Sequence, residues 1–170
     1  MKVLMHMCCA PCSVYPESVL AEEGNELEGL FYNPNIHPLE EYQRRQENVR
    51  LFSQIKNMRV NYIDDFRQKQ WEDFSGETAE RCAMCYALRL DKAASFAAEN
   101  GFDAFTTSLL VSPYQKHELI KELAEKAAQK HGVHFLCRDF RPGFRQGQQK
   151  AKEMGLYRQK YCGCILSKPE

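Results

Sequence analysis

Short apolar runs alternate along the chain with longer stretches of mixed polar and apolar residues. The runs at residues 3–7, 27–32, 60–63, 104–110 and 133–137 have the length of buried strands. Helices are predicted between them at residues 15–23, 39–55, 65–74, 79–100, 114–130 and 146–154. Strands separated by helices predict an α/β fold, with a parallel sheet covered by helices on both faces.

The helix at 39–55 is amphipathic, and its spacing places Tyr42, Val49, Phe52 and Ile55 toward the core. Glycines 24, 101, 132 and 155 follow predicted helices and mark their ends. No internal repeat, linker or low-complexity tract interrupts the pattern. We therefore expect residues 1–170 to form a single domain.

Unusual residues gather where the predicted strands end. Cys8 and Cys9 follow the first strand, residues 33–37 the second, Asp64 the third and Ser112 the fourth. Ligands of parallel α/β sheets bind at the carboxyl ends of the strands. The candidate site is therefore expected at this edge of the sheet.

The composition is that of a soluble globular protein, with 44% hydrophobic and 27% charged residues. Neither a secretory signal nor an apolar stretch long enough to cross a bilayer is evident, so we expect a cytoplasmic protein without a membrane partner. The formal net charge is zero. Residues 138–170 nevertheless carry eight basic and three acidic side chains, which makes this segment a candidate contact for nucleic-acid phosphates.

Eight cysteines are the main anomaly of the composition. Seven fall in three groups, CCxxC at 8–12, CxxC at 82–85 and CxC at 162–164. Clustered cysteines in a reducing compartment indicate metal binding or redox chemistry rather than structural disulfides. Cys137 stands alone, and we expect it to be a small core residue.

Cys82 and Cys85 lie near the start of a predicted helix, on one face of it. A helix N-terminus favours the thiolate, which is the metal-binding form. Together with the cysteines at 8–12 they could hold zinc or an iron–sulfur cluster. Adjacent cysteines are expected to diverge along an extended backbone, which favours [4Fe–4S] over zinc. The choice of ligands among Cys8, Cys9 and Cys12 stays open on spacing alone.

The CxC pair near the carboxyl terminus predicts a different kind of site, a disulfide. Gly163 gives the backbone the freedom to close a small, strained disulfide between Cys162 and Cys164. Strained disulfides are oxidising and labile, which suits a redox-active pair on a tail spanning 155–170. Two further metal ligands, or two inert thiols, are the alternatives.

Five stretches in order along nearly the whole chain resemble the QueH-type epoxyqueuosine reductases: HMCCAPCS (6–13), FYNPNIHPLEEYQRR (31–45), CAMCYALRL (82–90), FTTSLLVSPYQKH (105–117) and GLYRQKYCGC (155–164). The resemblance implies a Rossmann-like fold of the adenine nucleotide α-hydrolase type. It also implies an oxidoreductase of tRNA processing that needs no cobalamin. In this last step of queuosine synthesis, the epoxide of epoxyqueuosine at the tRNA wobble position is reduced to the alkene with loss of water.

The same resemblance implies roles for the cysteines. Cys8, Cys9, Cys82 and Cys85 would ligate a [4Fe–4S] cluster, and Cys162 with Cys164 would form a redox-active disulfide. Cys12 receives no role. Four thiolates leave no vacant iron, so an additional iron ion is a further hypothesis. The partners would be tRNA carrying epoxyqueuosine and an unidentified electron donor.

The leaving oxygen of the epoxide needs a proton source. His37, Asp64 and Tyr114 are candidates by their position after strands, although bracing a loop or starting a helix are alternative roles for the first two. Four basic residues are candidate tRNA contacts: Arg141, Arg145, Arg158 and Lys160. Four aromatic residues are candidates for stacking on anticodon bases: Tyr32, Tyr42, Tyr157 and Tyr161.

Two other function classes use the same residues. One is a zinc-stabilised RNA-binding module without catalysis, and the other is a thiol–disulfide oxidoreductase that works through Cys162 and Cys164. Colour separates them, since protein purified without oxygen is brown only if it holds an iron–sulfur cluster.

Overall fold

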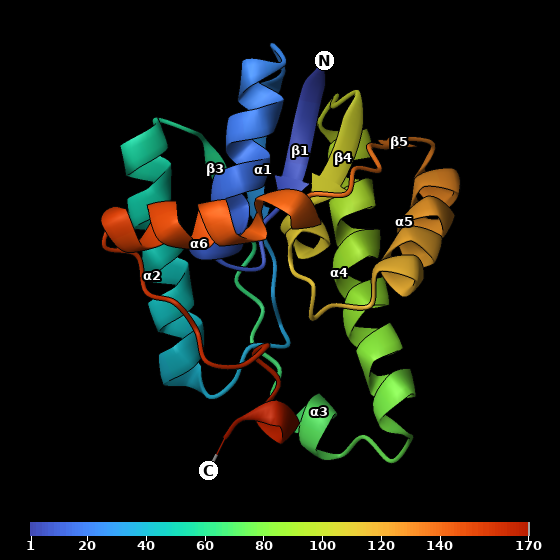
Figure 1. Ribbon diagram of the computed structural model, residues 1–170. Helices are drawn as coiled ribbons and strands as arrows, with labels where there is room; N and C mark the ends of the chain where they lie inside the picture. Colours follow the sequence, from blue (N-terminus) through green and yellow to red (C-terminus); the bar gives the residue numbers. More distant parts are fainter. Residues whose placement is uncertain (170) are drawn as a thin grey trace.

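A parallel five-stranded sheet forms the centre of the computed structural model, which describes residues 1–169. The strand order is β3-β2-β1-β4-β5, and every neighbouring pair is parallel. The strands are β1 (Lys2–His6), β2 (Glu26–Phe31), β3 (Val60–Tyr62), β4 (Ala104–Thr107) and β5 (His134–Phe135) (Figure 1). The predicted parallel α/β sheet is confirmed.

Helices connect the strands and cover both faces of the sheet. They are α1 (Ala10–Glu22), α2 (Leu39–Lys56), α3 (Lys69–Glu72), α4 (Thr78–Glu99), α5 (His117–His131) and α6 (Phe144–Glu153). Three short 3₁₀ turns complete the described elements, η1 (Ser108–Val111), η2 (Arg141–Gly143) and η3 (Ile165–Ser167). The chain builds the sheet from β1 outward to β3 and then crosses to the other side of β1. The switch point therefore lies between β1 and β4, where ligands bind in such folds.

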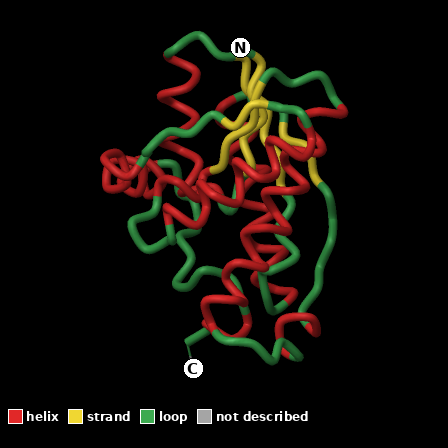
Figure 2. The backbone as a smooth tube through the Cα atoms, turned by 90° about the vertical axis from the view of Figure 1, so that its right-hand side faces the viewer, coloured by secondary structure: helices red, strands yellow, loops and turns green. Residues whose placement is uncertain are grey.

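The alternation of side chains along the strands divides the core between the two faces. Leu4 and Leu30 pack in one cluster with Leu90 of α4 and Ile120 of α5. Neighbouring strand positions face the other way, into a cluster formed with α1, α2 and α6: Met5, Phe31, Val14, Val49, Phe52 and Ala151. Figure 2 shows the strands at one end of the molecule and the carboxyl terminus at the opposite end.

The buried imidazole of His6 joins three strand ends. Its Nδ1 lies 3.0 Å from the Thr107 hydroxyl at the end of β4. Its Nε2 lies 3.1 Å from both the Tyr32 carbonyl oxygen and the Asn33 side-chain oxygen, just beyond β2. Since both of these are acceptors, Nε2 carries the ring proton. Burial, with a smaller contribution from the charge of Arg89, lowers the pKa of His6 to about 4, so the ring is neutral at physiological pH.

Two predictions are wrong, one for the segment between α2 and α4 and one for the end of α2. Helix is confined to Lys69–Glu72 instead of residues 65–74, because the Arg67 side chain turns back to Asp65 and its backbone N–H bonds the Pro34 carbonyl. Ile55 is 47% exposed, whereas Tyr42, Val49 and Phe52 are buried as predicted. Ile55 lies in the last turn of α2, on the same solvent-facing side of the helix as the exposed Leu51.

Three boundaries differ in ways that affect the candidate site. Helix α1 begins at Ala10 rather than residue 15, because Pro11 is well suited to a first helical turn, and this places Cys12 on the helix. Strand β4 ends at Thr107 and continues as the 3₁₀ turn η1. Strand β5 has only two residues, so Cys137 lies outside the sheet and is exposed; its predicted core position is wrong.

Within residues 1–169, no helix combines the length and apolar character required to cross a membrane.

Phe52 and Ile55, both on α2, give a matched test of the core. We expect Phe52→Ala to lower the free energy of unfolding by about 3–5 kcal/mol, because it empties a fully buried site. Ile55→Ala should change it by less than about 0.5 kcal/mol, since this side chain is half exposed. Denaturant unfolding measures both values, and similar losses for the two variants would contradict the packing described here.

Candidate metal and redox site

A pocket of about 470 Å³ lies at the carboxyl ends of the strands. Its volume is that of a site for a small molecule or a nucleoside. Six of the eight cysteines line it, Cys8, Cys12, Cys82, Cys85, Cys162 and Cys164. Cys9 is buried directly beside Cys8, so only Cys137 among the cysteines is remote. The three cysteine groups of the sequence therefore meet at one place.

The first group forms a compact triad at the start of α1. The sulfurs of Cys8, Cys9 and Cys12 lie within 4.8 Å of one another, and those of Cys8 and Cys9 are 3.9 Å apart. Cys9 is the N-cap of α1 and Cys12 belongs to its first turn. The positive end of the helix dipole thus favours negative charge on these sulfurs.

The triad does not titrate as three equivalent thiols. Hydrogen bonds from Cys12 and then from Cys9 hold the pKa of Cys8 well below its ordinary value. Burial raises the pKa of Cys9 to about 12. The hydrogen bond to Cys8 raises the pKa of Cys12 well above its ordinary value. Among the three sulfurs, Cys8 is therefore the one that most readily carries negative charge.

The thiol set fits a thiophilic metal ion or an iron–sulfur cluster. Two sulfurs on one tetrahedral ion with metal–sulfur bonds of about 2.3 Å lie about 3.8 Å apart, close to the Cys8–Cys9 separation. The expectation that adjacent cysteines diverge is therefore wrong here, because the chain turns from β1 into α1 at these residues. The separation alone no longer disfavours a single ion.

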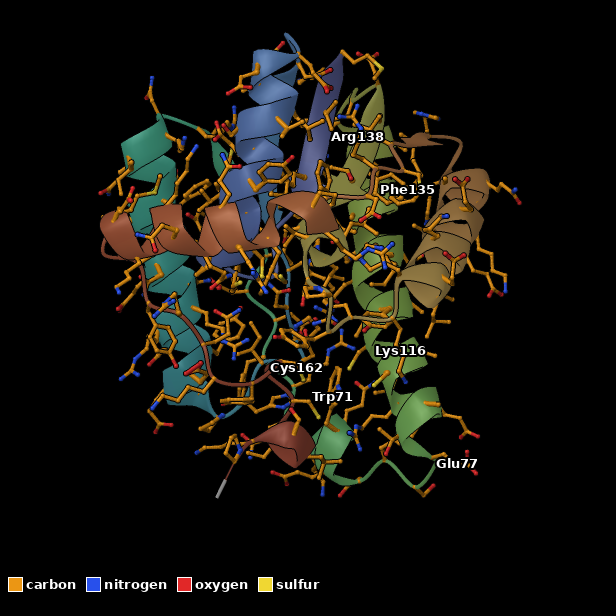
Figure 3. All side chains as sticks on the ribbon, in the orientation of Figure 1. Trp71, Glu77, Lys116, Phe135, Arg138 and Cys162 are labelled. Atoms are coloured by element: carbon orange, nitrogen blue, oxygen red, sulfur yellow. The ribbon has the colours of Figure 1, made fainter. Side chains whose placement is uncertain are left out.

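The second group comes from the start of α4. Cys82 is half-buried at the pocket, and Cys85 is buried below it. The indole N–H of Trp71, the single tryptophan of the chain, donates a hydrogen bond of 2.6 Å to the Cys85 sulfur. Trp71 is fully buried and packs in one cluster with Cys85 and Cys164. Figure 3 shows Trp71 and Cys162 in the space between α2 and α4.

Two other sulfurs accept hydrogen bonds from outside the cysteine groups. The Ser108 hydroxyl donates to Cys8 at 3.2 Å, and the Gln159 amide nitrogen donates to Cys9 at 2.7 Å. Such bonds orient thiolate ligands and stabilise their charge. The sequence reasoning missed Trp71, Ser108 and Gln159. All three residues meet the sulfurs only in the folded chain. The only sequence signal was that Ser108 and Gln159 lie within the stretches that resemble the QueH-type reductases.

A buried guanidinium holds the carboxyl-terminal segment over the pocket. Arg45 of α2 forms an ion pair of 2.9 Å with Glu41. Its two terminal nitrogens donate 2.8 Å hydrogen bonds to the carbonyl oxygens of Tyr161 and Cys162. The planar fork of an arginine suits this geometry, and a lysine cannot reproduce it. Arg45 thus fixes the segment immediately before the CxC pair.

His37 anchors the segment on the other side of the pair. Its backbone N–H donates to the Gly163 carbonyl at 2.7 Å, and its Nδ1 accepts from the Ile165 backbone N–H at 2.9 Å. Its Nε2 donates to the carbonyl oxygens of Pro34 and Arg67. Burial lowers the pKa of His37, which keeps Nδ1 available as an acceptor. Both ring nitrogens therefore serve to brace the loop and the tail.

The CxC pair consists of two free thiols with different exposure. Cys162 is exposed and its sulfur lies 3.0 Å from the Ser167 hydroxyl, whereas Cys164 is 4% exposed. Between them, Gly163 has a φ of +132°, and a Cβ there would come within 3.1 Å of Arg45 and Ile36. Only glycine fits this position, so the backbone that carries both thiols is tightly defined.

Sequence comparison identifies the family of the chain. The family described as "Epoxyqueuosine reductase QueH" matches residues 3–170. The chain belongs to the QueH family. A relative of that name from Dehalococcoides mccartyi is 35% identical over 99% of this chain and 93% of the relative. The QueH from Thermotoga maritima is 35% identical, covering 97% and 89%, and the QueH from Acinetobacter baylyi is 37% identical, covering 98% and 80%.

Solved structures share the fold of this QueH family member at low identity. A teicoplanin-biosynthesis deacetylase superposes with a TM-score of 0.53 at 9% identity, covering 91% of this chain and 86% of the deacetylase. A predicted subunit of a tRNA methyltransferase from Methanocaldococcus jannaschii gives 0.50 at 12% identity, covering 90% and 77%. Both support the Rossmann-like α/β fold, with its parallel sheet covered by helices.

The remaining candidate residues are distributed unevenly around the pocket of this QueH family member. Tyr114 and Lys160 line it. Asp64 is exposed outside the lining and accepts hydrogen bonds from Tyr42 and Gln46. Arg141 lies on a second, smaller cavity and is paired with Asp139 at 2.8 Å. Arg145 and Arg158 are exposed.

The anchoring of the tail predicts the reactivity of Cys164. In the reduced, metal-free protein, Arg45→Lys should raise the rate of Cys164 alkylation roughly tenfold, because a lysine cannot hold both carbonyls, and tenfold corresponds to about 1.4 kcal/mol of local stability. Cys162 is already exposed and should change little. Iodoacetamide labelling followed by mass spectrometry of the peptides gives both rates.

Arg50→Lys is the control, because Arg50 also lies on α2 but stacks on Tyr62, away from the tail. It should leave both rates unchanged. Equal protection of Cys164 in wild type and Arg45→Lys would show that the tail is held by other contacts.

Proposed function

We propose that the protein is an epoxyqueuosine reductase, which reduces the epoxide of epoxyqueuosine in tRNA to the alkene of queuosine. The observation that supports it is the convergence of six thiols on one pocket at the switch point of a QueH family chain. The reaction breaks two carbon–oxygen bonds, forms one carbon–carbon double bond and releases water. It consumes two electrons and two protons, so a redox site is required.

The proposed cofactor is a [4Fe–4S] cluster held by Cys8, Cys9, Cys82 and Cys85. Such a cluster, when bound, supplies single electrons at low potential. Cys8 and Cys9 come from the turn into α1, and Cys82 and Cys85 from α4, so the set draws on two elements that meet at the pocket. Cys12 lies within 4.8 Å of the first two sulfurs and is a candidate ligand for an additional iron.

Cys162 and Cys164 are the proposed source of the electron pair. Their oxidation to a disulfide releases two electrons and two protons, the quantity that one epoxide consumes. Both line the pocket, and the exposed Cys162 is open to an external electron donor that would reduce the disulfide again. The tail of residues 155–170 would thus act as a redox segment of the enzyme.

The basic side chains of the pocket lining suit an RNA substrate. A modified base in an anticodon loop must leave its stack to reach the cysteines. Lys160 lines the pocket and would meet the phosphate backbone near that base, and Arg145 and Arg158 offer further exposed charge. Arg141 is the weakest of the proposed tRNA contacts, because Asp139 already neutralises it.

The direct test is turnover without oxygen. Anaerobically purified protein is incubated with epoxyqueuosine-containing tRNA and a chemical reductant, and the nucleosides are analysed after digestion. We expect conversion to queuosine by a brown protein that contains iron and sulfide. Colourless, zinc-loaded protein that binds the tRNA without converting it would contradict the proposal.

Cysteine variants separate the two redox elements. Cys85→Ala should lose iron and turnover together, because a cluster ligand is missing. Cys162→Ala should keep its iron but lose turnover, because Cys164 alone cannot form the disulfide that supplies the electron pair. Cys137→Ala is the matched control and should keep both, since Cys137 lies outside the pocket. Iron content, absorbance and nucleoside analysis give the three readouts, and full iron content in Cys85→Ala would remove it from the ligand set.

A further inference from the structure

Tyr114 is exposed far more than any other large apolar side chain of residues 1–169. It is 84% exposed, and the next value is 57%, at Met1. The exposure does not come from a loose loop, because the Tyr114 backbone N–H donates to the Ser112 hydroxyl at 3.2 Å and Ser112 itself is buried. Tyr114 also lines the cysteine pocket. The fold thus holds a bare aromatic ring at the entrance of its reactive site.

A second ring supports the first. Phe144, at the start of α6, lies edge-on to Tyr114, with ring centroids 5.9 Å apart and an interplanar angle of 83°. Phe144 also lines the pocket and is half-buried in the core. An edge-to-face contact fixes the orientation of a ring while leaving one of its faces available. Tyr114 therefore presents a flat surface to solvent from a rigid support.

The charged side chains that line the pocket are all basic, and one of them, Arg45, is paired with Glu41. The pocket lining contains five cations and, among the described residues, no carboxylate: Arg45, Arg81, Arg89, Lys116 and Lys160. Lys116 and Lys160 are exposed, whereas Arg45 and Arg89 are buried. An aromatic platform beside a cationic groove is the arrangement that binds single-stranded nucleic acid.

The other aromatic candidates for base stacking are already engaged. Tyr32 and Tyr42 are buried. The hydroxyl of Tyr157 donates to Glu41, and the ring of Tyr161 lies beneath the Arg45 guanidinium. Tyr114 is the aromatic residue of the pocket lining whose ring is free to meet a base.

We propose that Tyr114, supported by Phe144, is a stacking platform for a base of single-stranded RNA next to the nucleotide that enters the pocket. The inference rests on the proposed function and identifies where the anticodon loop is held. Extruding one base unstacks its neighbour, and stacking that neighbour on Tyr114 offsets the cost. In this role the ring of Tyr114 matters and its hydroxyl does not.

RNA affinity tests the platform. An anticodon stem-loop carrying epoxyqueuosine is labelled with a fluorophore, and its binding is followed by anisotropy at fixed salt. We expect Tyr114→Ala to weaken binding by roughly 5- to 100-fold, the range for one lost base–aromatic stack. Tyr114→Phe should bind and turn over as wild type within about twofold, because it keeps the ring. The melting temperature should stay unchanged in both variants, since the side chain is exposed.

The control variant is Leu51→Ala, which removes another exposed apolar side chain, one on α2 that does not line the pocket. It should not change the affinity. A stem-loop with an abasic nucleotide beside the modified one should bind wild type as weakly as the intact loop binds Tyr114→Ala. That variant should not distinguish the two RNAs.

Four results would overturn the platform. Wild-type affinity in Tyr114→Ala would do so while leaving the proposed function intact. Equal loss of turnover in Tyr114→Phe and Tyr114→Ala at unchanged affinity would assign the role to the hydroxyl as a proton donor. If Tyr114→Ala binds the RNA as wild type does but is reduced more slowly by a protein electron donor, the ring belongs to the contact surface for that donor. Failure of wild type to bind or convert the RNA would overturn the inference together with the proposed function.

Discussion

The site depends on a neutral histidine that ties the carboxyl ends of β1, β2 and β4 together. His6 accepts from Thr107 and donates to oxygens just beyond β2, so the three strands end in a fixed relation. The segments that follow them are the turn into α1, the loop before α2 and the turn η1. These segments carry Cys8, the tail anchor His37 and Ser108. A protonated ring would repel Arg89 and lose its acceptor, so burial and charge together keep His6 neutral.

Electrostatics then make the same edge of the sheet suited to thiolates. The N-terminus of α1, Arg81 and Arg89 of α4, and hydrogen bonds from Trp71, Ser108 and Gln159 each favour negative sulfur and offset part of the cost of its burial. A cationic pocket also attracts RNA phosphates. The electrostatic requirements of a thiolate metal site and of an RNA-binding site therefore coincide. The same positive charges serve the thiolates and the RNA. Because these charges are gathered at the pocket, a chain of zero net charge still presents a cationic pocket.

The sequence predicted the sheet and the convergence of the cysteines well, because apolar runs, helix stops and short motifs are local signals. It failed where long-range contacts decide. The helix at 65–74 shrank because its backbone bonds the loop at Pro34, and Cys137 is exposed because β5 pairs for only two residues. The roles of Arg45 and Trp71 were invisible for the same reason. Each contacts residues far away in the chain, and neither has a characteristic spacing. His37 was predicted as a candidate proton donor. In the structure, its ring braces the loop before α2 and the carboxyl-terminal segment.

The CxC pair of the carboxyl-terminal segment is held through the main chain around it. Arg45 donates hydrogen bonds to two carbonyl oxygens, and His37 contacts one carbonyl oxygen and one N–H. These contacts use main-chain groups and do not depend on the side chains at positions 162 to 165, whereas Tyr157, Gln159 and Tyr161 also make contacts through their side chains. Gly163 is the exception, because its φ and its close neighbours tolerate no other residue. Natural variation can therefore adjust the surroundings of the CxC thiols, and with them their redox potential, while the position of the thiols over the pocket is inherited unchanged.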